Sequence, residues 1–233
     1  MGVDRLNIGV QSFRDDRLRF LGRMHSGKAA VQAIDAARAA GFDNLGLDLI
    51  YGLPGQNLAS WQNTLAQALA LQPQHLSIYE LTVEENTPFA RMQQQGELHL
   101  PPEDTVLQML EATQQLTEQA GVHRYEISNY ARPGCECRHN LNYWQNGAWL
   151  GLGASAVSSG QGRRYAAIAD VVEFCRRLEN GQEVWQEKEE LSAAAMFRET
   201  VVIGLRMTAG LSLTEPAGLL PSSLASIWLV LFG

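Results

Sequence analysis

Residues 44–56, NLGLDLIYGLPGQ, decide the fold of this chain. The run from Asn44 to Tyr51 reads as a strand, and Asp48 is the one charge inside its otherwise apolar sequence. The glycines and the proline that follow force a turn. A helix is expected beyond that turn, from about Leu58 to Leu71, because apolar residues recur there at helical spacing: Trp61, Leu65, Ala68 and Leu69.

Further units with the same order of elements lie on both sides of this stretch. Upstream, a strand from Leu6 to Phe13 precedes a helix from Gly27 to Ala40, and downstream a strand is expected from His75 to Thr82. Tandem units of this kind imply parallel strands joined by right-handed crossovers. The sequence therefore predicts an α/β fold, a piece of a βα barrel or of an open doubly wound sheet. Chemistry in such folds gathers at the carboxyl ends of the strands.

The regular alternation ends after the third strand. A helix is expected from about Pro102 to Ala120 and a strand from His123 to Tyr130, followed by an irregular segment that runs to Gly162. Two further helices are expected near residues 168–180 and 192–207. This part of the chain is therefore predicted to be mainly α-helical.

We place a domain boundary near Arg132. It divides the chain into a partial barrel at residues 1–131, an accessory region at residues 132–215 and a tail at residues 216–233. From Pro216 onward there is not one charged residue, although the preceding helix holds several. We expect this tail to be a foreign or out-of-frame ending, and the alternative is an apolar C-terminal helix that docks on a partner.

Composition limits the classes of function. The formal net charge of −7 argues against broad attraction to nucleic acids or to anionic membranes. Cys135, Cys137 and Cys175 are too few and too irregularly placed for a secreted disulfide scaffold, so a reducing cytoplasm is the expected setting. The apolar run from Ala225 to Phe232 is shorter than the ~20 residues that span a bilayer, and no integral membrane segment is expected.

Four blocks of sequence carry a resemblance to a known family. They are RLNIGVQSF at residues 5–13, LDLIYGLPGQ at residues 47–56, YEISNYARPG at residues 125–134 and CRHNLNYW at residues 137–144. Over about residues 2–214 the chain resembles the oxygen-independent coproporphyrinogen III oxidase-like family of radical SAM proteins, in its HemW heme-chaperone branch. The order and the spacing of the blocks are those of the family.

The resemblance implies a six-stranded (β/α)6 radical SAM barrel. In the full-length family a 4Fe–4S cluster, held by a C-x3-C-x2-C loop, reduces S-adenosyl-L-methionine to a 5′-deoxyadenosyl radical. The motif is absent here, and Cys135, Cys137 and Cys175 have the wrong spacing to replace it, so no cluster is expected on this chain. We read the chain as a fragment that begins at about the fourth strand of the barrel, which leaves its status as an enzyme open.

Three residues match positions at which the family contacts S-adenosylmethionine. The amide of Gln11 at a strand end can both donate and accept, the guanidinium of Arg23 can pair with a carboxylate, and Asp48 can accept from ribose hydroxyls or the amino group. Two of the three also have a simpler interpretation. Gln11 can be a packing residue and Arg23 a solvated cation, whereas an unpaired charge such as Asp48 inside a strand costs several kcal/mol to bury.

His139 is the candidate for heme contact. The resemblance associates the segment from His139 to Trp144 with heme, and an imidazole beside aromatic rings suits an axial iron contact. The alternative is a histidine hydrogen-bonded within an irregular loop. Two positions depart from the family: Val157 stands where a histidine is usual, and Cys135 occupies another common histidine position.

The sequence thus supports two hypotheses. By resemblance, the chain is a heme chaperone or coproporphyrinogen oxidase-like protein of porphyrin metabolism, whose partners are heme or a porphyrin and a heme-accepting protein. The alternative is a non-catalytic truncated remnant or a cluster-free heme-binding protein.

Overall fold

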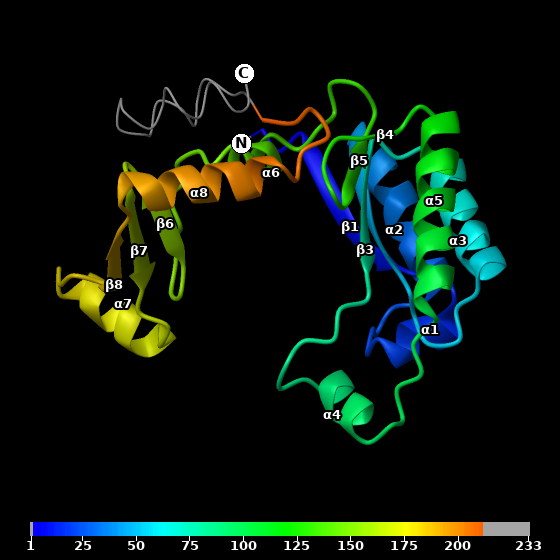
Figure 1. The fold of residues 1–233 in the computed structure, drawn as a ribbon, viewed down its shortest axis with the longest axis horizontal. Helices are drawn as coiled ribbons and strands as arrows, with labels where there is room; N and C mark the ends of the chain where they lie inside the picture. Colours follow the sequence, from blue (N-terminus) through cyan, green and yellow to red (C-terminus); the bar gives the residue numbers. More distant parts are fainter. Residues whose placement is uncertain (1, 212–233) are drawn as a thin grey trace. The chain divides into compact units, whose positions relative to one another are not determined.

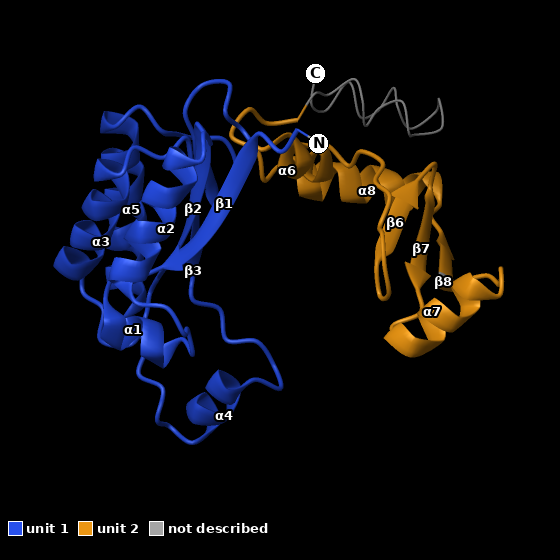
Figure 2. Cartoon of the chain, turned by 180° about the vertical axis from the view of Figure 1, so that it is seen from behind, with its two compact units in different colours: residues 1–136 blue, residues 137–233 orange. Residues whose placement is uncertain are grey.

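The computed structural model describes residues 2–211 (Figure 1). The chain divides into two units, unit 1 up to Glu136 and unit 2 from Cys137 (Figure 2). The boundary near Arg132 stays a prediction. The charge-free tail lies outside the described residues.

Unit 1 is built on a five-stranded sheet. The parallel strands β1 (Arg5–Gln11), β2 (Asn44–Tyr51) and β3 (His75–Glu80) lie side by side, as the tandem units predict. Two short strands, β5 (Asn129–Ala131) and β4 (His123–Arg124), complete the order β1-β2-β3-β5-β4. β5 runs antiparallel to both of its neighbours.

Three helices cover one face of this sheet: α2 (Gly27–Ala39), α3 (Leu58–Ala70) and α5 (Glu103–Gln119) (Figure 1). Their apolar stripes and the strand residues that face them form one core, whose largest members include Ile34, Leu47, Trp61, Leu65, Leu76 and Met109. The fully buried Trp61 donates through Nε1 to Thr113 Oγ1 at 2.8 Å, which satisfies its one polar atom.

The alternation along β2 gives the sheet two different faces. Leu45, Leu47 and Leu49 are buried against the helices. Gly46 and Asp48 therefore point to the opposite side, which we call the open face.

Unit 2 combines helices with a three-stranded antiparallel sheet. The helices are α6 (Arg138–Trp144), α7 (Val171–Glu179) and α8 (Ala193–Gly204). The strands β6 (Val157–Gly160), β7 (Arg163–Ala167) and β8 (Trp185–Glu190) pair in that order. Arg164 on β7 binds Glu199 on α8 through two hydrogen bonds of 3.0 and 2.7 Å, a paired geometry that joins the sheet to the helix.

Several elements differ from the sequence prediction. The expected strand from His123 to Tyr130 is two strands, because the Tyr125 and Glu126 amides both donate to the Asn129 carbonyl and close a tight reversal. Between the first predicted strand and helix the structure has an additional helix, α1 (Asp15–Phe20), whose first turn holds Asp15 and Asp16, where acidic side chains interact favourably with the positive end of the helix dipole. Helix α6 and strand β6 lie in the segment predicted to be irregular, and helix α4 (Pro88–Gln94) and strands β7 and β8 lie where the sequence predicted neither a helix nor a strand.

Among residues 2–211, the structure contains no helix with the length and apolar character that a membrane crossing requires.

Candidate functional site

Asp48 lies at the centre of the open face. It is level with Gly9 on β1 and Ser77 on β3, and Ser77 is level with Asn129 on β5, so these residues form one row across the sheet. Burial raises the pKa of the Asp48 carboxyl, while the Ser77 hydroxyl that hydrogen-bonds it and the charge of Arg5 act in the opposite direction. A ligand with hydrogen-bond donors would therefore stabilise the charged carboxylate.

Gln11 reaches the same row from the end of β1. Its φ of 62° is in the left-handed region, and the pairing with β2 is broken between Gly9 and Gln11. The Ser12 amide donates to the Val10 carbonyl at 2.7 Å, which makes Gln11 the centre of a γ-turn. A Cβ added to Gly9 would lie 2.9 Å from Gln11 Nε2, so the carboxamide folds back over Gly9 beside Asp48.

Arg23 lies in the loop between α1 and α2. The Gly22 amide donates to Arg19 at 3.0 Å and the Arg23 amide donates to Leu18 at 2.8 Å, which together form a Schellman cap. That cap needs a left-handed residue, and Gly22 supplies it with a φ of 68°. The side chain of Arg23 is exposed. The fold thus groups Gln11 and Asp48 on one face, and it does not bring the exposed Arg23 into contact with them.

The turn after β2 is held by a buried arginine that sequence reasoning missed. Arg17, only 8% exposed, donates to the carbonyls of Pro54 and Gly55. Within the turn, the Leu53 amide donates to Gln56 Oε1 at 3.1 Å. The sequence pattern predicted no helix at α1, so it offered no signal for Arg17.

A second polar group on the open face was also missed. His75 is fully buried, and its Nε2 lies 2.8 Å from the Tyr125 hydroxyl. Glu126 and Asn129 are likewise buried, and Asn129 Nδ2 donates to Glu126 Oε1. Strand periodicity predicts which face of the sheet such residues lie on, but it does not show which of them hydrogen-bond to each other.

The buried imidazole predicts a pH-dependent stability. Burial first, and the charge of Arg5 second, lower the pKa of His75 from 6.5 to about 3. The unfolded chain therefore binds a proton more readily, so the stabilisation is complete above pH 6.5 and is lost as the pH falls toward 3. The loss is about 1.4 kcal/mol for each pH unit in that window. In urea unfolding between pH 6.5 and 4.5, His75→Gln is expected to show a shallower slope; equal slopes would contradict the neutral buried imidazole.

His139 begins an aromatic series in unit 2. It is exposed on α6, every residue of which is at least partly exposed. Its ring meets Tyr143 edge-on with centroids 4.8 Å apart, and Tyr143 lies 4.8 Å from Trp149. Arg206 lies over the Trp144 ring at 4.5 Å, which holds the end of α6. The imidazole is thus accessible and supported by rings.

The three cysteines are the possible thiolate ligands of the chain. Cys135 and Cys137 are partly buried, Cys175 is exposed, and none of the three forms a disulfide bond. In the part of the chain that the structure describes, no three His, Cys, Asp or Glu side chains converge as a metal site would require. The residues do not fit a 4Fe–4S cluster, which needs thiolates that meet at one point.

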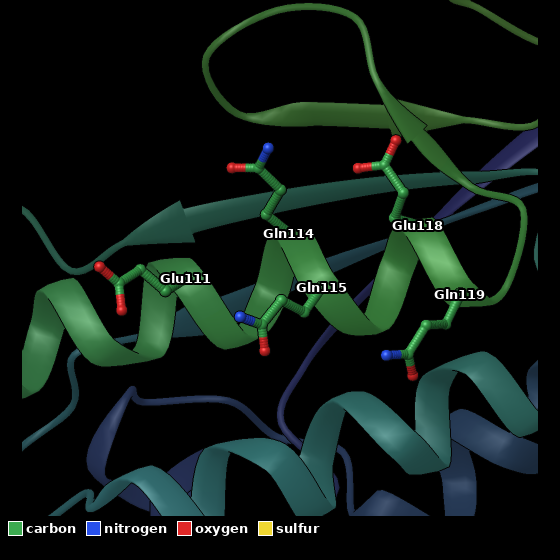
Figure 3. A pocket seen from close by; sticks show the side chains of 5 residues that line it. All are labelled: Glu111, Gln114, Gln115, Glu118 and Gln119. Carbon is green, nitrogen blue, oxygen red and sulfur yellow. The ribbon is translucent and has the colours of Figure 1, made fainter.

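A cavity of about 550 Å³ lies along α5 (Figure 3). Its lining consists of carboxylate and amide side chains: Glu111, Gln114, Gln115, Glu118 and Gln119. Because α5 packs on the face opposite the open face, this cavity is separate from the row around Asp48.

Comparisons with known proteins identify the family of the chain. The family model for the Radical SAM superfamily matches residues 1–68. The heme chaperone HemW of Bacillus subtilis is 39% identical over 211 residues, which cover 91% of this chain and 56% of that protein. HemW of Escherichia coli is 43% identical over 155 residues, 66% of this chain and 40% of that protein. The chain spans about half the length of the curated relatives it matches.

The fold has a counterpart among solved structures. Coproporphyrinogen III oxidase (HemN) from Escherichia coli, a radical SAM enzyme, superposes with a TM-score of 0.70 at 24% identity, over 88% of this chain and 50% of that one. This match confirms the predicted α/β fold. With the HemW relatives it leads to one assignment: the chain belongs to the radical SAM proteins of the oxygen-independent coproporphyrinogen III oxidase-like family, in its HemW branch.

Proposed function

We propose that this chain is a heme-binding protein of the HemW type, which holds heme at His139 and S-adenosylmethionine on the open face of unit 1. Relatives at 39% and 43% identity are named heme chaperones. The observation that carries the proposal is the exposed His139 ring, supported edge-on by Tyr143.

An exposed imidazole on an aromatic platform suits heme. The Nε2 or Nδ1 lone pair of a neutral histidine can ligate iron, and rings beside it offer apolar area to the porphyrin. Since His139 is at the surface rather than in a closed pocket, heme bound there stays within reach of an acceptor protein. This accessibility supports the delivery of heme from His139 to such an acceptor.

The open face suits the polar groups of S-adenosylmethionine. Asp48 would accept from the ribose hydroxyls or the amino group, the Gln11 amide would donate and accept beside it, and Arg23 would pair with the carboxylate. Gly9 has no side chain, so the Gln11 carboxamide can lie over the strand next to Asp48, where both groups are available to one ligand. Bound S-adenosylmethionine supplies a sulfonium that can be cleaved reductively in radical SAM chemistry.

A cluster-free heme-binding protein is the second candidate. It is favoured by the cysteine spacing, because Cys135, Cys137 and Cys175 cannot surround one cluster. For that reason we derive no radical step on this chain. Cysteines that form no disulfide also suit a reducing cytoplasm as the location of the protein.

Gel filtration of the hemin-loaded chain tests the proposal. Heme absorbance is expected to co-elute with the protein and to move to apomyoglobin when that acceptor is added in excess. Elution without heme would reject heme binding. Heme that stays on the chain in the presence of apomyoglobin would reject delivery.

A further inference from the structure

The Val10 carbonyl receives two hydrogen bonds at the end of β1. It lies where the pairing between β1 and β2 is broken, so it is turned away from the ladder. The Ser12 amide donates to it at 2.7 Å, and His25 Nε2 lies 3.2 Å from it. Because a carbonyl can only accept, Nε2 must carry the proton in this contact.

The bond from Ser12 closes a turn that is unfavourable by itself, and the bond from His25 holds the same carbonyl from outside the turn. A γ-turn with positive φ is rare and strained, and Gln11, which is not glycine, occupies its centre with a φ of 62°. Such a conformation persists only where surrounding contacts determine it. His25 provides one of those contacts from outside the strand.

His25 belongs to the loop that also carries Arg23. The far end of this loop is fixed, because the Gly27 amide donates to Asp15 Oδ1 at 2.8 Å. A Cβ on Gly27 would lie only 2.1 Å from the Phe13 carbonyl, so glycine is required for this close approach. The loop is therefore held against the end of β1 on both sides of Ser26, by His25 before it and Gly27 after it.

We infer that His25 is a positioning residue, which holds the Gln11 carboxamide over Gly9 by donating to the Val10 carbonyl. The inference rests on the proposed binding of S-adenosylmethionine by Gln11. Without the bond from His25, the turn relaxes toward ordinary backbone geometry and the amide leaves its place beside Asp48. The hydrogen bond from His25 to the Val10 carbonyl thereby fixes both the loop that carries Arg23 and the turn at Gln11.

Two amide substitutions separate this role from general stability. His25→Gln places an N–H close to the position of Nε2, whereas His25→Asn carries the same amide one methylene shorter and does not reach Val10. Binding of S-adenosylmethionine to the full chain is measured by isothermal titration calorimetry. His25→Gln is expected to bind within about twofold of the unmodified chain. His25→Asn is expected to bind about three- to tenfold more weakly, as loss of one hydrogen bond implies.

Both substitutions are repeated in a Gln11→Ala chain. If His25 acts through Gln11, the Gln and Asn variants then bind equally. Equal affinities of His25→Gln and His25→Asn in the original chain would overturn the inference, as would a difference that persists undiminished after Gln11→Ala. Either result leaves the proposed function intact. If the unmodified chain does not bind S-adenosylmethionine, the proposed site fails and the inference falls with it.

Discussion

Replacing Asp48 with alanine is expected to weaken S-adenosylmethionine binding about 10- to 100-fold, because hydrogen bonds to a charged partner contribute about 1.5–3 kcal/mol. Asp48 is the carboxylate at the centre of the open-face row, between Gly9 and Ser77. Burial already raises its pKa, so its charged form depends on the donors around it. Isothermal titration calorimetry at neutral pH measures the loss.

Asp48→Asn separates charge from shape in this experiment. It keeps the size of the side chain but cannot attract an ammonium group, so we expect it to bind almost as weakly as Asp48→Ala. The matched control is Asp35→Asn, since Asp35 is an exposed carboxylate on α2 and lies away from the open face. If Asp48→Ala bound as tightly as Asp35→Asn, Asp48 would have only a structural role.

Replacing His139 with alanine is expected to raise the hemin dissociation constant by at least about tenfold, since losing even an outer-shell partner of a metal ligand costs 10- to 100-fold. The substitution leaves Tyr143 and Trp149 in place, so their apolar area remains available. Quenching of tryptophan fluorescence by hemin reports the constant, because Tyr143, next to His139, contacts Trp149.

The matched control for the heme experiment is His99→Ala. His99 is also exposed, and it lies in unit 1 outside the aromatic series of α6. We expect this variant to bind hemin like the original chain. Equal weakening of both variants would mean that hemin binds histidines at random, and no weakening in His139→Ala would remove His139 as a ligand.

Local sequence signals were sufficient to predict the parallel strands of unit 1 and the helices α2 and α3. The apolar run of β2, the turn at Gly52–Gly55 and the helical spacing of α3 predicted this strand, its turn and its helix within a residue or two. The Asn57–Ser60 capping box explains why α3 begins where it does. Asp48 was the clearest candidate because it is an acid within an apolar strand.

Other features depend on backbone geometry that residue types do not reveal. The γ-turn at Gln11 and the contact from His25 arise from a break in strand pairing, and neither residue favours that turn by itself. The β4–β5 reversal depends on the Asn129 carbonyl, which any residue could supply. In unit 2, β8 reads Trp-Gln-Glu-Lys-Glu-Glu and lacks the alternation that marks a half-buried strand.

Hemin titration of the unmodified chain, followed by its Soret band, tests the central claim most directly. If His139 and its neighbouring rings hold heme, the band shifts and saturates at one heme per chain. Absorbance that rises in proportion to added hemin, with the spectrum of free hemin throughout, would contradict the account.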